Sequence, residues 1–191
     1  MRITIILLLF VMGCSKVKPV SEAELHKYVL DKENGLTQTI EVNGLKITMT
    51  YRPSELIAKQ QMIKDTQREY DSLTEYFSSY LYFLMEITYN NKDLETSFAL
   101  KPSTFAANIS YVSDKMGEDI KLVSETETLP VVDYVYARSY GVGPSQFLLA
   151  FEKPKSNQFQ VEMKTDAIGM GNHSFSFNKK DLENRPHLKL Y

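Results

Sequence analysis

The side chains that most often carry chemistry are few in this sequence and lie far apart. The chain of 191 residues has one cysteine, Cys14, and three histidines, His26, His173 and His187. No H-E-x-x-H or H-x-H spacing is present, and a single cysteine excludes an internal disulfide and a cysteine-based zinc site. We therefore expect neither a resident metal ion nor a cofactor.

Local catalytic motifs are also absent. The sequence has no G-x-S-x-G nucleophile elbow, and residues 169–171 (Gly-Met-Gly) form a lone G-x-G that predicts a turn rather than a phosphate cradle. The acidic residues Glu125, Glu127 and Asp133 lack the ligand order of a calcium loop and predict a solvated loop. We expect a protein without enzymatic activity. Carboxylates or a histidine that converge only in the fold would give a hydrolase, and this reading stays open.

Tyrosine and arginine form the most suggestive polar pattern. The chain has 12 tyrosines and no tryptophan, and alternation places several tyrosines on common faces of two predicted strands. Exposed tyrosine together with arginine is typical of binding hot spots, whereas the same rings can also cover a helix or fill a core. The candidate interaction surface consists of Tyr134, Tyr136, Arg138, Tyr140, Tyr80 and Tyr82.

The first residues carry an export signal. Arg2 precedes an apolar run over residues 3–11, which is shorter than the roughly 20 residues of a membrane-spanning helix. The run ends in Val11-Met12-Gly13-Cys14, which resembles the lipobox of bacterial lipoprotein precursors. This resemblance implies that residues 1–13 are a signal peptide, that the Cys14 thiol is diacylated, and that the new amine is acylated, commonly with palmitate. The alternative is a plain signal peptide with an incidental cysteine.

The residues after Cys14 bear on location. Ser15 stands where enteric inner-membrane lipoproteins carry Asp, and residues 15–20 hold no acidic cluster of the kind found in surface-exported lipoproteins. The resemblance therefore implies an outer-membrane lipoprotein, with the periplasmic face favoured over the cell surface. Two or more acyl chains hold a protein stably on a membrane, so the lipid is the expected membrane attachment. Asp71-Ser72-Leu73 also resembles an O-glycosylation site of Bacteroidota.

Composition sets the domain organisation. The chain is 43% apolar and 24% charged, as in globular proteins, and its formal net charge of −2 argues against a general nucleic-acid binder. Residues 14–20 predict a lipidated tether, and residues 21–191 predict a single α+β domain.

The predicted domain is an antiparallel sheet or sandwich of about seven to eight strands with one long amphipathic helix packed on it. Asn43-Gly44 predicts a hairpin turn that pairs Val42 with Leu45, and the resulting inner face is apolar except at Gln38. The long helix is predicted between residues 54 and 77, from apolar residues seven apart. Strands are predicted over 36–42, 45–51, 79–90, 119–124, 131–140, 146–153, 158–165 and 173–178.

Three segments resemble small lipoproteins of Bacteroidota whose function is uncharacterised. They are residues 51–56 (Tyr-Arg-Pro-Ser-Glu-Leu), 136–141 (Tyr-Ala-Arg-Ser-Tyr-Gly) and 175–182 (Phe-Ser-Phe-Asn-Lys-Lys-Asp-Leu). This resemblance implies an envelope location and no particular activity. We expect a membrane-anchored, non-catalytic interaction or structural protein, accessory to an envelope complex and its protein partner. A binding protein for a peptide, glycan or lipid is the alternative.

Overall fold

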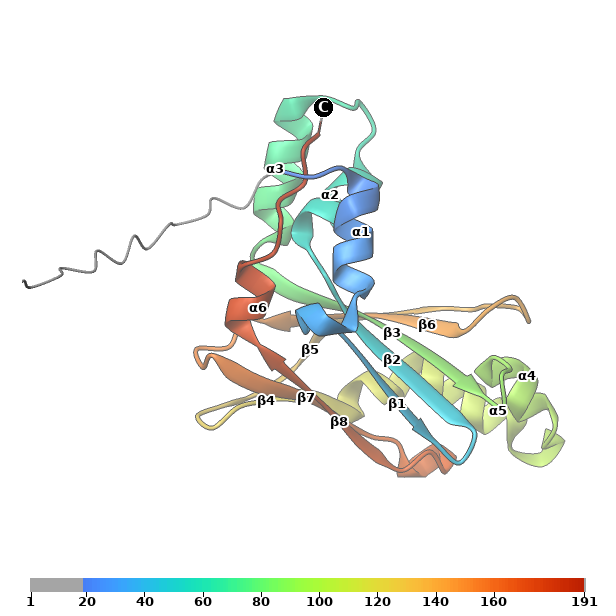
Figure 1. Ribbon diagram of the computed structural model, residues 1–191. Helices are drawn as coiled ribbons and strands as arrows, with labels where there is room; N and C mark the ends of the chain where they lie inside the picture. Colours follow the sequence, from blue (N-terminus) through green and yellow to red (C-terminus); the bar gives the residue numbers. More distant parts are fainter. Residues whose placement is uncertain (1–18, 191) are drawn as a thin grey trace, which may run out of the picture.

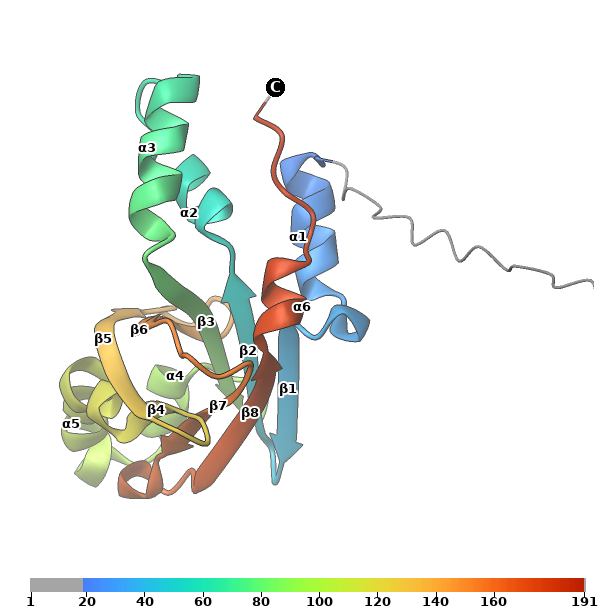
Figure 2. The same ribbon diagram turned by 90° about the vertical axis from the view of Figure 1, so that its left-hand side faces the viewer.

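Eight antiparallel strands in the order β1-β2-β3-β6-β5-β4-β7-β8 form a nearly closed barrel. The computed structural model describes residues 19–190, so the predicted signal peptide and Cys14 lie outside the described residues. Figures 1 and 2 show the sheet curling around a common interior, with helices at both ends. The α+β class and the antiparallel sheet are confirmed. The strands are β1 (Thr37–Val42), β2 (Leu45–Arg52), β3 (Tyr80–Tyr89), β4 (Ile120–Val123), β5 (Thr128–Ala137), β6 (Ser145–Glu152), β7 (Gln158–Lys164) and β8 (Asn172–Asn178).

The β1–β2 hairpin has the predicted register. Val42 pairs with Leu45, and the pairing continues to Thr37 opposite Thr50. The turn residues Asn43 and Gly44 both have positive φ, as a two-residue hairpin of this type requires. A Cβ on Gly44 would meet the Asn90 side-chain oxygen at 2.2 Å, so any other residue here would have to displace the Asn90 side chain.

Gln38 closes the seam between the two edge strands of the barrel. Its side-chain amide donates to the Ser176 carbonyl in β8, and its Oε1 accepts from the Ser176 backbone N–H at 3.1 Å. Because β1 and β8 are the ends of the strand order, these contacts join edges that the backbone ladder leaves apart. The one polar residue on the predicted apolar face therefore has a structural role.

Aromatic side chains fill the barrel interior. Phe83 is fully buried, and its ring lies 4.8 Å from that of Phe177 and 6.1 Å from that of Phe151, centroid to centroid. Phe147 and Phe175 are also fully buried, together with aliphatic and methionine side chains from neighbouring strands and helices. The alternation predicted for β3 is confirmed, since Leu81, Phe83, Met85 and Ile87 point inward.

Helices close the two ends of the barrel. One end carries α1 (Glu22–Leu30), α2 (Ser54–Gln61), α3 (Gln67–Phe77) and α6 (Lys179–Glu183), which stand above the strands in Figure 1. The other end carries α4 (Leu94–Ala99), which the sequence analysis did not predict, and α5 (Pro102–Ser110). A π-helical turn (Tyr111–Lys115) and a 3-10 turn (Met116–Asp119) extend α5, so that this helical stretch has 18 residues.

The predicted long helix between residues 54 and 77 is instead two helices. Met62 leaves helical geometry at the end of α2, and Thr66 caps the start of α3. In the intervening segment, Asp65 has positive φ, and the Glu69 carboxylate accepts the backbone N–H groups of Ile63 and Lys64 at 3.0 and 2.7 Å. The seven-residue spacing was therefore fortuitous at Ile63, which is 90% exposed. The longest helical stretch lies at 102–119 instead.

Candidate functional site

Tyr134 and Tyr136 do not lie on an exposed face. Their rings point into the barrel, where Tyr136 stacks on Phe147 at 4.7 Å and the Tyr134 hydroxyl donates to the Val112 carbonyl at 2.5 Å. A Cβ on Gly117 would lie 3.0 Å from the Tyr134 ring, so this glycine allows a close approach. Burial raises the pKa of both phenols. These two tyrosines are therefore partly buried against the core and not exposed, which corrects the prediction of a partner surface at this point.

The other four residues of the predicted surface are separated. β5 ends at Ala137, so Arg138 and Tyr140 lie in the following loop, where Tyr140 is 81% exposed. Tyr80 begins β3, whereas this loop precedes Ser145, which pairs near the far end of β3. Tyr82 is buried on the outer side of β3 beneath the Phe77 ring at 5.8 Å. The six residues therefore form no common exposed surface.

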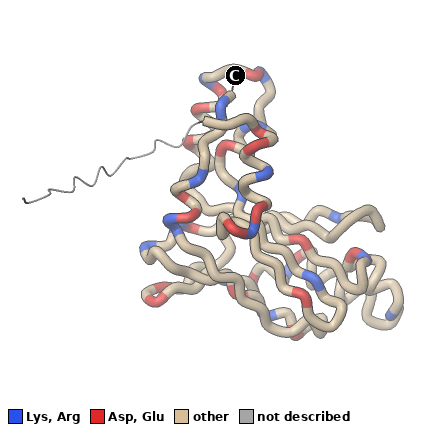
Figure 3. The backbone as a smooth tube through the Cα atoms, viewed as in Figure 1, with Lys and Arg blue, Asp and Glu red and all other residues tan. Residues whose placement is uncertain are grey.

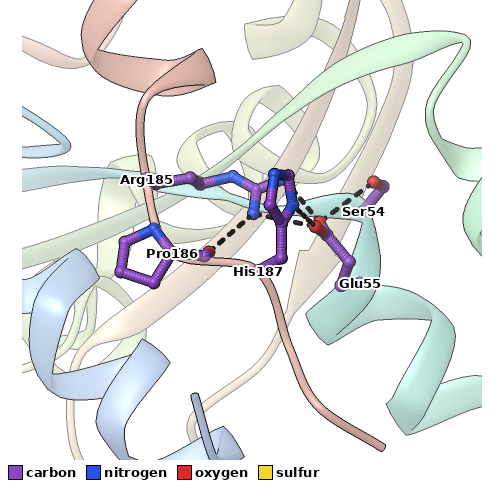
Figure 4. A network of polar contacts seen from close by, with 5 residues as sticks. All are labelled: Ser54, Glu55, Arg185, Pro186 and His187. Atoms are coloured by element: carbon purple, nitrogen blue, oxygen red, sulfur yellow. Dashed lines mark hydrogen bonds and ion pairs between the residues drawn. The ribbon is translucent and has the colours of Figure 1, made fainter. Parts of the chain in front are cut away.

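A buried ionic cluster joins the start of α2 to the C-terminal segment. The Arg185 guanidinium donates from Nη1 to Glu55 Oε1 at 2.8 Å and from Nη2 to Oε2 at 2.5 Å, so the contact is bidentate (Figure 4). Both side chains are only 8% exposed. His187 Nδ1 lies 3.0 Å from Glu55 Oε1, and the Ser54 hydroxyl donates to Oε2 at 3.3 Å. One carboxylate thus holds three neighbours.

The electrostatics of this cluster favour an ionised Glu55. Burial by itself raises the pKa of the Glu55 carboxyl, but the hydrogen bonds and charge of Arg185, together with the hydrogen bond from His187, outweigh burial and hold this pKa below its ordinary value. Glu55 also lies in the first turn of α2, where a negative charge complements the helix dipole. Burial raises the pKa of the neighbouring Tyr51 phenol, against the opposing charge of Arg185.

This geometry does not match a nucleophilic triad. A serine nucleophile needs an imidazole as its base, with the carboxylate behind the imidazole. Here the Ser54 hydroxyl is bonded to the carboxylate, and the carboxylate is already neutralised by Arg185. His173, the other histidine near a turn, is bonded to the Met170 carbonyl at 2.8 Å. The cluster is therefore arranged to hold chain segments together.

A pocket of about 230 Å³ lies beside the cluster. Its cationic groups are Lys153, Lys179 and Arg185, of which Arg185 is paired with Glu55 and Lys179 lies 4.0 Å from Glu183. Most of its positive charge is therefore already balanced. The remaining lining residues are Tyr51, Ser54, Ser78, Tyr80, Leu81, Pro154, Leu182, Glu183 and His187.

The same C-terminal segment fixes the start of the described chain. Val20 donates to the His187 carbonyl at 2.9 Å, and the Lys189 N–H donates to the Val20 carbonyl at 2.8 Å, giving an isolated parallel bridge between Val20 and Leu188. Arg185 and His187 hold this segment against α2. Val20, the last residue of the predicted tether, is thus anchored through the C-terminal segment to Glu55. Sequence reasoning missed the cluster, because its partners lie 130 residues apart and no local pattern connects them.

The outer side of the sheet carries a row of apolar side chains. Leu84, Leu148 and Val135 lie opposite one another on the adjacent strands β3, β6 and β5, and we name them the outer apolar row. Leu84 and Leu148 are half-buried and Val135 is exposed. A register shift between Val131 and Asp133 turns Tyr134 inward and Val135 outward. The exposed side of β5 therefore carries Val135, and not the tyrosines that the sequence pattern placed there.

Comparisons with known proteins add no family. No family model, no curated protein and no solved structure matches this chain. The residues that the structure describes contain no group of three or more His, Cys, Asp or Glu side chains that could hold a metal ion. Within residues 19–190, no helix is both long enough and apolar enough to cross a bilayer.

Proposed function

We propose that this protein is a lipid-anchored envelope protein whose barrel domain has a non-catalytic role, as a binding or structural partner in an envelope complex. The observation that carries the proposal is the junction at Val20. The lipobox-like sequence ends at Cys14, and six residues later the chain is already fixed to the domain by the bridge to Leu188. This arrangement suits a folded domain held close to a membrane on a short tether.

The filled interior supports a binding role on the surface rather than inside the barrel. Contacting phenylalanine rings occupy the space between the strands. Small barrels that carry a ligand keep an interior cavity for it. The buried ionic cluster, with its carboxylate neutralised, serves the fold. These features favour the interaction protein over a ligand carrier or a hydrolase with a non-local site.

The outer apolar row is the surface that we assign to an envelope protein partner. It is extended by the exposed Val132 on β5, and the ring of Tyr76 lies beside Phe77 at the adjoining end of α3. An apolar surface with aromatic residues at its margin is typical of a protein-binding surface.

The test is crosslinking and pull-down of the full precursor from detergent-solubilised membranes of its native host. We expect a stoichiometric partner, attachment of acyl chains at Cys14 by intact mass, and loss or weakening of partner recovery in Cys14→Ala. Val135→Asp should reduce recovery at unchanged thermal stability, whereas Val142→Asp, at an exposed loop position, should not. Lipidated protein recovered without any partner would refute the interaction role, and a Cys14 without lipid would refute the anchor.

A further inference from the structure

The end of the molecule that receives the tether also carries the tip of the α2–α3 hairpin. Figures 1 and 2 show the α2–α3 connection, the start of α1 and the C-terminus together at the top of the molecule. A common pocket confirms this neighbourhood, since it is lined by Val20 and Glu22 at the chain start, Lys59 in the last turn of α2, and Leu190. The connection over residues 62–66 directly follows that turn.

The tip is a built structure that presents one apolar side chain. The Glu69 carboxylate accepts the N–H groups of Ile63 and Lys64, and Lys59 Nζ bonds to Asp65 Oδ1 at 2.7 Å. These contacts fix the backbone on either side of Ile63, whose side chain is 90% exposed. An aliphatic side chain that is this exposed contributes almost no buried apolar area to the stability of the domain.

The length of the tether limits how far this end can lie from a membrane. Val20 is six positions after Cys14, and six fully extended Cα-to-Cα steps span at most about 22 Å. A domain anchored by acyl chains on Cys14 therefore keeps Val20, which lies at its helical end, within that distance of the headgroups. The tip is the exposed apolar point of that end.

We propose that the α2–α3 tip is a second membrane contact, in which Ile63 enters the lipid surface that holds the acyl chains and Lys64 stays among the headgroups. This inference rests on the proposed anchor at Cys14. Figure 3 shows acidic and basic residues interspersed at this end of the molecule, so apolar insertion rather than general electrostatic attraction carries the contact. Together with the anchor, this contact would set the orientation of the domain, with its helical end toward the membrane.

The absence of tryptophan makes a direct test possible, because Ile63→Trp introduces the only indole of the chain. The chain from Cys14 onward is coupled through its single thiol to maleimide-bearing phosphatidylethanolamine in vesicles of phosphatidylethanolamine and phosphatidylglycerol, with or without brominated acyl chains. The matched control is Val142→Trp. Val142 is 84% exposed and lies in the loop before β6, near the end of β3 that is far from α3. Thermal unfolding of both variants establishes that they are folded before coupling.

We expect coupled Ile63→Trp to show blue-shifted emission and quenching by brominated lipid, and Val142→Trp to show neither. Unshifted and unquenched emission from Ile63→Trp would overturn the proposal, as would equal quenching of both variants. A concentration-dependent blue shift of Ile63→Trp without vesicles would also overturn it, because this would indicate contact between copies. Chemical coupling supplies the anchor, so failure here is separate from the absence of lipid on Cys14 in the native host.

Discussion

Removing the Glu55 carboxylate should destabilise the domain more than any loss of a surface charge. Glu55→Gln leaves Arg185, whose side chain is 8% exposed, with an uncompensated positive charge. Breaking a buried ion pair by removing one partner costs about 3–5 kcal/mol. With an m value of about 2 kcal/mol per molar urea for a domain of this size, the midpoint of unfolding should fall by about 1.5–2.5 M.

A double-mutant cycle separates the pair from its surroundings. Arg185→Met alone should also destabilise, because it leaves the Glu55 carboxylate buried with only His187 and Ser54 as neighbours. The double variant should be more stable than the sum of the single effects predicts, by at least about 1 kcal/mol, since neither charge is then left unpaired. The matched control is Lys46→Met, which removes an exposed ion pair with Glu41 and should cost at most about 1 kcal/mol.

Urea unfolding at neutral pH, followed by circular dichroism, gives all four stabilities of the cycle. Two results would refute the reasoning: single effects no larger than that of Lys46→Met, or single effects that add to within about 0.5 kcal/mol in the double variant. Either result would mean that the contact in Figure 4 does not hold the C-terminal segment on α2.

Two further predictions concern pH and the barrel seam. The folded-state pKa of Glu55 lies below its ordinary value of 4.5, so its contribution to stability is present above pH 4.5 and is lost as the pH falls through the folded-state pKa. The difference in unfolding free energy between wild type and Glu55→Gln should therefore narrow in unfolding curves measured at descending pH. A constant difference would contradict this assignment. Gln38→Leu removes both contacts to Ser176 and should lower the free energy of unfolding by about 1–2 kcal/mol, with faster hydrogen exchange in β8. Glu41→Gln on the same strand is the control. Unchanged exchange in β8 would show that the seam closes without Gln38.

Local patterns predicted the elements whose stability is local. Asn43-Gly44 specified the hairpin and its register, because two positive-φ residues allow one tight turn and the period of two then fixes each face. The S-x-x-E pattern of Ser21 and Glu24 is typical of a helix start, and both halves of this capping box form at α1. The α+β class followed from such elements. The prediction of one helix between residues 54 and 77 was wrong, because a spacing of seven at Leu56, Ile63 and Tyr70 could not reveal the turn at Asp65.

The sequence by itself determined the hairpin, the alternation of the strands and the lipobox-like segment, because each depends on residues that are neighbours in the chain. Only the tertiary structure decided which face of β5 points inward, since the shift near Asp133 and the ring of Phe147 are set by pairing with β6. It also decided the role of Gln38 and the meeting of Glu55 with Arg185. These contacts join residues more than a hundred positions apart, and barrel closure brings them together only when all eight strands are in register.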